Sequence, residues 1–249
     1  MKLFVVLLLA LLSFGTGALA QNVALGTADA FALLGASGVT NVSKHTHIIG
    51  DVGSSPTPDV TGLDQSQVNG KLYLTASPVT AQAQIDLAAA YGQAAGEPCG
   101  TDLTGLDLGG MTLGPGVYCF SSSAGLTGTL TLDAYGNTKA NWIFQVGSTL
   151  TTASDSKVII KVGHKQSPNG KVGPEPLWSK GLRGCNVYWQ VGSSATIADG
   201  SIFVGQIIAL SDITLNGGTL RGKALTGNGA ITMSDRETVS GARCNVGTD

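Results

Sequence analysis

Regularly spaced hydroxyl side chains are the feature of this chain best suited to a chemical role. Thr196, Thr214 and Thr232 follow one another at intervals of 18 residues, and each stands between small or apolar neighbours. Neighbouring side chains of a strand point to opposite faces, so the apolar residues would point inward and the threonines outward. Aligned threonine hydroxyls and methyls contain no nucleophile–base pair. Such a surface is suited to ordering water and unsuited to catalysis.

Internal matches extend this row of threonines along the chain. Residues 141–151 match residues 186–196, which places Thr151 level with Thr196, and the segment that begins at Val39 resembles the segment that begins at Ile213. Thr is a common outward residue of any strand, so a single one carries little weight, whereas an aligned set carries more. The expected outward set, which we call the hydroxyl ladder, is Thr40, Thr129, Thr131, Thr149, Thr151, Ser194, Thr196, Thr214, Asn216, Thr232 and Ser234.

Acidic side chains offer the main alternative, an enzyme. Glycoside hydrolysis requires two carboxylates at a defined separation in a cleft. The available acids in the regular repeats are Asp199, Asp212, Asp235 and Glu237. The first three lie near expected turns, where Asp is a common turn former. We therefore expect no catalytic activity.

Histidines offer a possible metal site, and the alternative is that they are solvent-exposed side chains that bind no metal. His45 and His47 would face the same way on one strand, but neither an acid nor His164 joins them by spacing. Solvated histidines are the simpler interpretation. We predict no metal site and no cofactor.

Four cysteines and one sequon bear on the compartment of the protein. Cys99, Cys119, Cys185 and Cys244 show no CxxC spacing, so disulfides are favoured over a zinc or redox site. Four cysteines allow three connectivities, of which we favour Cys99–Cys119 with Cys185–Cys244. Asn41 begins the one glycosylation sequon that we identify, Asn41-Val42-Ser43.

The first 20 residues have the features of a secretory signal peptide. Lys2 precedes the apolar run 3–12, and the small-residue site 18–20 precedes Gln21. Ten apolar residues are too few to span a membrane. We expect a secreted, extracellular protein with one domain over residues 21–249.

The composition and net charge of the chain limit the kinds of partner that it could bind. The formal net charge is −2, and charged residues make up 12% of a chain with 36 glycines. Such a chain has no long-range field that would attract nucleic acid or an anionic membrane. We expect neither partner, and we expect a monomer.

The 18-residue interval suits one coil of a β-solenoid with three short strands, which must stack on neighbours to bury its apolar face. Ser77 and Pro78 predict the start of a helix over about 78–95, with Val79, Ala83, Leu87, Ala90, Tyr91 and Ala94 on its inner stripe. This helix would carry the chain from an N-terminal coil, which ends at Ser54–Pro58, to the far end of the stack. Residues 163–184 are predicted to form an inserted surface loop.

Four segments carry a recognisable pattern: Leu25-Gly26-Thr27-Ala28, Gly50-Asp51-Val52-Gly53-Ser54-Ser55-Pro56, and the two matching repeats that begin at Trp142 and Trp189. Together they resemble the DUF3494 family of secreted ice-binding proteins. The resemblance covers nearly all of the chain after the leader. It implies a discontinuous right-handed parallel β-helix, mainly β, with one long α-helix alongside. It also implies ice binding by one flat face, with Thr40 in that face.

We therefore predict a non-enzymatic protein whose partner is the ice crystal surface. The alternative is an extracellular carbohydrate-binding or adhesive β-helix. A carbohydrate-binding face should carry exposed aromatic residues, and the ladder positions contain none.

Overall fold

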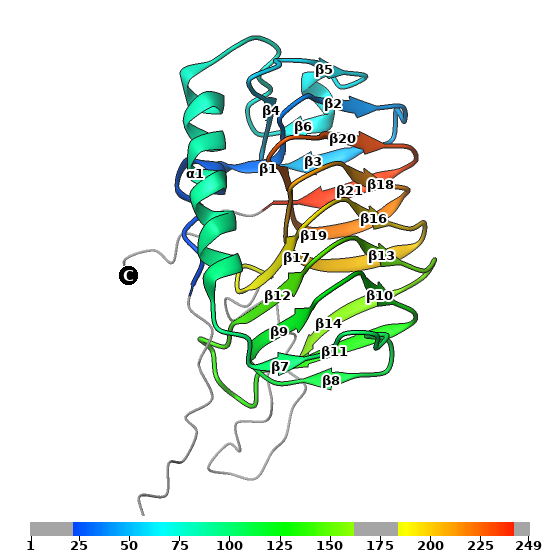
Figure 1. Ribbon diagram of the computed structural model, residues 1–249. Helices are drawn as coiled ribbons and strands as arrows, with labels where there is room; N and C mark the ends of the chain where they lie inside the picture. The colour runs from blue at the N-terminus through cyan, green and yellow to red at the C-terminus, as the bar shows by residue number, and fades with distance from the viewer. Residues whose placement is uncertain (1–21, 162–183, 242–249) are drawn as a thin grey trace, which may run out of the picture.

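The protein is a parallel β-helix with one α-helix along its side (Figure 1). The computed structural model describes residues 22–161 and 184–241. Each coil contributes strands to three sides, which we name the helix side, the threonine side and the third side. The predicted fold class is confirmed by this architecture. The leader and the predicted loop over residues 163–184, apart from Gly184, lie outside the described residues.

The helix side is built from parallel strands whose outer surface is covered by the helix. Its strands, in stacking order, are β7 (Thr101–Asp102), β9 (Gly116–Phe120), β12 (Trp142–Val146), β15 (Val187–Val191), the second halves of β17 (Ser201–Ala209) and β19 (Gly218–Thr226), β1 (Phe31–Gly35) and β4 (Asp51–Ser54).

The threonine side is a separate sheet of seven parallel strands. In stacking order they are β10 (Ala124–Leu126), β13 (Leu150–Thr152), β16 (Ala195–Ile197), β18 (Ile213–Leu215), β20 (Ala230–Met233), β2 (Gly38–Asn41) and β5 (Val60–Thr61).

The third side completes each coil. Its strands are β8 (Thr112–Leu113), β11 (Thr129–Asp133), β14 (Lys157–Lys161), the first halves of β17 and β19, β21 (Glu237–Ser240), β3 (His47–Ile49) and β6 (Val68–Asn69).

Glycine allows β17 to belong to two sides. At Gly205 the backbone has φ +123°, and a Cβ there would lie 2.7 Å from Trp189 Nε1. The strand therefore turns a corner that a residue with a side chain could not form without strain.

The chain does not follow the order of the stack. The first strands in sequence, β1 and β2, pair with β19 and β20, which come almost last (Figure 1). The predicted N-terminal coil is therefore present. The expected exit at Ser54–Pro58 is wrong, because β5 and β6 form a further coil before the chain reaches the helix.

Helix α1 (Pro78–Gly96) confirms the predicted element. Ser77 Oγ accepts a hydrogen bond from Val79 N at the start of the helix. The buried residues are Thr80, Ala83, Leu87, Ala90 and Ala94. Two residues predicted to lie on the inner stripe are less buried than expected: Val79 is 38% exposed and Tyr91 is only half-buried. Neither α1 nor any shorter helix of the described residues is long and apolar enough to cross a membrane.

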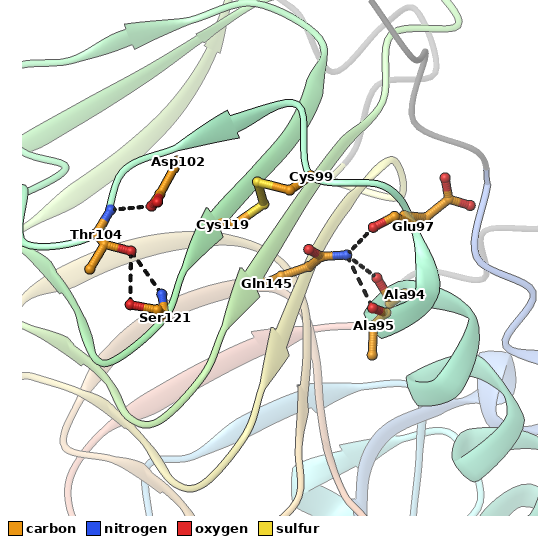
Figure 2. Close-up of a disulfide and its surroundings, with 9 residues drawn as sticks. All are labelled: Ala94, Ala95, Glu97, Cys99, Asp102, Thr104, Cys119, Ser121 and Gln145. Atoms are coloured by element: carbon orange, nitrogen blue, oxygen red, sulfur yellow. Dashed lines mark hydrogen bonds between the residues drawn. A yellow bond between two sulfur atoms is a disulfide. The ribbon is translucent and has the colours of Figure 1, made fainter.

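The end of α1 is held by a glutamine and a disulfide (Figure 2). Gln145 Nε2 donates to the carbonyl oxygens of Ala94, Ala95 and Glu97, which a helix end leaves without partners of its own. The predicted Cys99–Cys119 disulfide is present, with 5.9 Å between the Cα atoms. Cys185 is also disulfide-bonded, and Cys244, its expected partner, lies outside the described residues.

Two apolar layers hold the coils and the helix together. Inside the solenoid, Phe144 stacks on Trp189 with ring centroids 4.0 Å apart, and Tyr118 and Phe203 extend the aromatic column at its two ends. Between the helix and the sheet lie Leu87, Ile143, Tyr188, Ile208 and Leu225, all buried. Two short 3-10 helices, η1 (Gly26–Ala30) and η2 (Gln65–Gln67), complete the described elements.

Stability should fall as pH rises, through Glu237. This side chain is 2% exposed, and burial raises the pKa of its carboxyl from 4.5 to about 7; the hydrogen bond from Gly217 N lowers that pKa and Asp199 raises it further. Because the folded chain binds the proton more tightly, this contribution is complete below about pH 4.5 and is lost as pH rises through about 7.

Glu237→Gln should remove this decline, since it stays neutral. The stability difference between variant and wild type should change by roughly 3 kcal/mol between pH 4.5 and pH 8, given about 1.4 kcal/mol per pKa unit. Urea unfolding at both pH values measures the change. Parallel pH profiles for the two proteins would contradict the prediction.

Candidate functional site

The threonine side carries a straight row of threonines in strict register. Strand pairing places Thr151 beside Thr196, then Thr214 and Thr232, and continues out of sequence order to Thr40 and Thr61. We call these six the central row: Thr151, Thr196, Thr214, Thr232, Thr40 and Thr61. Parallel strands lie about 4.8 Å apart, so the hydroxyls recur at that interval.

Local sequence explains why these threonines point outward. In β18 the neighbours of Thr214, Ile213 and Leu215, are fully buried in the solenoid, and the same pattern repeats around Thr232. Alternation along the strand then leaves the threonine outside. Because threonine is branched at Cβ, its first side-chain torsion is restricted, which holds the row in a fixed arrangement.

The hydroxyls of the central row are available to water. Among the described residues, those of Thr151, Thr196, Thr214 and Thr232 have no hydrogen-bond partner in the protein, and all four residues are partly or fully exposed. Between β5 and β2, the strands at the upper end of Figure 1, Thr61 Oγ1 donates to Thr40 Oγ1 over 3.3 Å.

Two flanking rows lie about 6.6 Å to either side, the distance between alternate residues of a strand. One contains Thr149 and Ser194, and the other contains Asn216 and Ser234, as predicted from the alternation. Side chains of both flanking rows are tied between coils: Thr149 Oγ1 donates to Ser123 Oγ, and Ser234 Oγ to Asn216 Oδ1, each over 2.8 Å.

Two predicted members of the hydroxyl ladder, Thr129 and Thr131, do not belong to this surface. Both lie in β11 on the third side, where Thr131 pairs with Ile159 and is only 8% exposed. The alternating pattern of β11 fits any partly exposed strand, so it could not indicate the side. At this level of the threonine side Gly125 stands in register with Thr151.

Sequence reasoning missed Thr61, which extends the row at the other end. It lies in the coil that was taken to be outside the solenoid. The signal was present: Asp59-Val60-Thr61 repeats the Val-Thr pair of Gly38-Val39-Thr40, and the two pairs are adjacent in the sheet.

Asn41, the predicted glycosylation site, is buried and hydrogen-bonded in the folded protein. Its side chain is 4% exposed, and its Nδ2 donates to the carbonyl oxygens of Ser43 and Gly62. Its Oδ1 accepts from the hydroxyl of Thr46. A glycan on Nδ2 would displace the turn that these bonds hold.

Most of the acids and histidines weighed as chemical groups lie apart from the central row, whereas Asp212 lies beside it, two residues before Thr214. Asp199 and Asp235 are exposed on turns between the threonine and third sides, while Glu237 is buried beneath that corner. His45 and His47 are exposed near the third side, and His164 lies outside the described residues. Over residues 22–161 and 184–241, no three His, Cys, Asp or Glu side chains are placed to hold a metal ion.

Comparisons with known proteins agree with this arrangement. Residues 33–239 match the family model described as ice-binding-like. The ice-binding protein of Nostoc sp. (strain HG1) is 46% identical over 233 residues, which cover 92% of this chain and 78% of the relative.

Solved structures resemble the fold as well as the sequence. An ice-binding protein from an Antarctic biological consortium aligns with a TM-score of 0.76 and 35% identity, over 89% of this chain and 92% of that one. The ice-binding protein of Antarctomyces psychrotrophicus gives 0.71 and 32%, over 88% and 98%. With a family model that matches most of its length and these relatives, the chain belongs to the ice-binding-like family.

Proposed function

We propose that this protein adsorbs to ice through the threonine side and thereby slows the growth and recrystallisation of ice crystals. Membership of the ice-binding-like family supports the activity. The observation that supports the choice of surface is the central row, whose hydroxyls recur in register. Four of the six, from Thr151 to Thr232 in the stack, have no hydrogen-bond partner among the described residues.

The geometry suggests how such a surface acts. Each threonine presents a methyl group, which water surrounds, beside a hydroxyl, which donates and accepts hydrogen bonds. Repeated at the coil spacing, these groups hold water in an ordered layer that can merge with the crystal. Adsorbed molecules then force the ice front to curve between them, which opposes further growth.

The proposal also includes the oligomeric state of the protein and its location outside the cell. We infer a secreted, extracellular monomer whose single domain begins at Gln21 and which acts without catalysis, cofactor, nucleic acid or membrane. The Cys99–Cys119 disulfide supports an oxidising compartment. The carbohydrate-binding alternative is not favoured, because no aromatic residue stands in the central or flanking rows.

A bulky residue in the central row should abolish most activity. In Thr214→Tyr the ring would project from the middle of the row and keep neighbouring threonines away from a flat crystal. We expect most of the freezing hysteresis measured in a nanolitre osmometer to be lost, while the circular dichroism spectrum is unchanged.

The matched control is Thr129→Tyr, which places the same ring on the third side. It should keep the hysteresis of the wild type. Equal losses in both variants would reject the threonine side as the binding surface, and an inactive wild type would reject ice binding itself.

Extending the central row should increase activity. Gly125 is in register with Thr151, its φ is outside the left-handed region, and a new Cβ would meet only Asp107 Oδ2, at 3.2 Å. Gly125→Thr should therefore fold normally and add a seventh threonine. We expect higher hysteresis at equal concentration, with Gly125→Ala, which adds a Cβ at the same position but no hydroxyl, as the comparison. A decrease for Gly125→Thr with intact folding would contradict the additive role of the row.

Secretion predicts a defined N-terminus. Expression of the full sequence in a secreting host should yield protein in the medium that begins at Gln21, as read by N-terminal sequencing. Ala20→Arg should block this cleavage because the site requires small residues. Retention of the intact leader on soluble, active protein would contradict the assignment.

A further inference from the structure

Asp212 is a charged residue in a flanking row that also contains Asp59 and is otherwise neutral. It is exposed in the flanking row, level with Ala230 of the next coil, and two residues before Thr214 of the central row. Its Oδ1 accepts a hydrogen bond of 2.8 Å from Ala230 N. The carboxylate is thus directed toward the neighbouring coil.

A second tie joins the same two coils on the other side of the central row. Ser234 Oγ donates to Asn216 Oδ1 over 2.8 Å. Asp212 and Asn216 belong to the coil of Thr214, whereas Ala230 and Ser234 belong to the coil of Thr232. The pair Thr214 and Thr232 is therefore enclosed by two side-chain crosslinks, one in each flanking row.

The tie made by Asp212 follows a geometry found elsewhere on the threonine side. Ser123 occupies the equivalent place two coils beyond Thr196, and its Oγ is 3.4 Å from Thr149 N and accepts from Thr149 Oγ1 over 2.8 Å. Hydrogen bonds to ionised acceptors are stronger than neutral ones. Asp212 thus supplies the stronger version of a repeated contact.

We propose that Asp212 and the Asn216–Ser234 pair are positioning residues for ice binding, which fix Thr214 and Thr232 relative to each other. This inference rests on the proposed function. β18 and β20 are short, with 3 and 4 residues. Few backbone hydrogen bonds therefore restrain this part of the coil, and the side-chain ties restrain both edges of the strands. Asp212 acts through Ala230 and does not contact ice.

Asp59 provides a matched control within the same flanking row. It is exposed, it lies level with Gly38 beside Thr61, and among the described residues its carboxylate makes no hydrogen bond. Removing Asp59 therefore removes one negative charge from the surface without removing a tie between coils.

The test compares Asp212→Ala, Asp212→Asn and Asp59→Ala in the full mature chain. The measurements are the lowest protein concentration that stops ice recrystallisation and the melting temperature. Asp212→Ala should fold and require about fivefold more protein, the factor that corresponds to one hydrogen bond of about 1 kcal/mol. Asp212→Asn should act like the wild type, because its Oδ1 still accepts from Ala230 N. Asp59→Ala should lose less activity than Asp212→Ala, because it removes a charge without removing a tie between coils.

Three outcomes would overturn the inference. Asp212→Ala could equal the wild type, Asp212→Asn could be as weak as Asp212→Ala, or Asp59→Ala could lose as much activity as Asp212→Ala. Ser234→Ala removes the second tie, so it should also raise the required concentration, and it decides the matter if Asp212→Ala does not fold. A wild type without any activity would instead refute the proposed function, and this inference with it.

Discussion

Register between parallel coils is the constraint on which the rest of the structure depends. Residues 201–209 of β17 pair one to one with residues 218–226 of β19, so each coil places its residues over the same positions of the next. A slip of one residue would exchange the inner and outer side chains of a whole strand. The buried aromatic column and the exposed central row are therefore two results of one backbone arrangement.

The end of a stack of coils must also be covered, and in this chain the N-terminal segment covers it. The N-terminal coils cover the last coils in sequence, and a buried ion pair secures the junction. Lys223 Nζ lies 3.5 Å from Asp29 Oδ1 and donates to the carbonyl oxygens of Asp29 and Gly241. A buried lysine requires such partners, because an unpaired charge would be strongly destabilising. The unpaired strand edges left by winding are thereby covered at this end.

Periodicity made most of this architecture predictable, and the failures have physical causes. The interval of Thr196, Thr214 and Thr232 gave the coil length, and Ser77 with Pro78 marked the helix start. Thr129 and Thr131 were assigned to the wrong side because alternation records exposure but not which of three sides a strand occupies. Thr61 was missed because the two prolines before it suggested an exit from the solenoid, whereas the chain resumes pairing at Val60. The tie from Asp212 to a backbone amide has no sequence signal at all.

A flat crystal is recognised differently from a protein partner. Protein interfaces concentrate binding energy in a few anchoring residues, whereas the central row offers many similar contacts of which none is dominant. Joined contacts reinforce one another only if all of them can form at once. Small errors in spacing would accumulate along the row, so the accuracy of the repeat matters more than the strength of any hydroxyl. This requirement accounts for the division seen on the threonine side: several flanking groups use their hydrogen bonds within the protein, and the hydroxyls of Thr151, Thr196, Thr214 and Thr232 keep theirs for water.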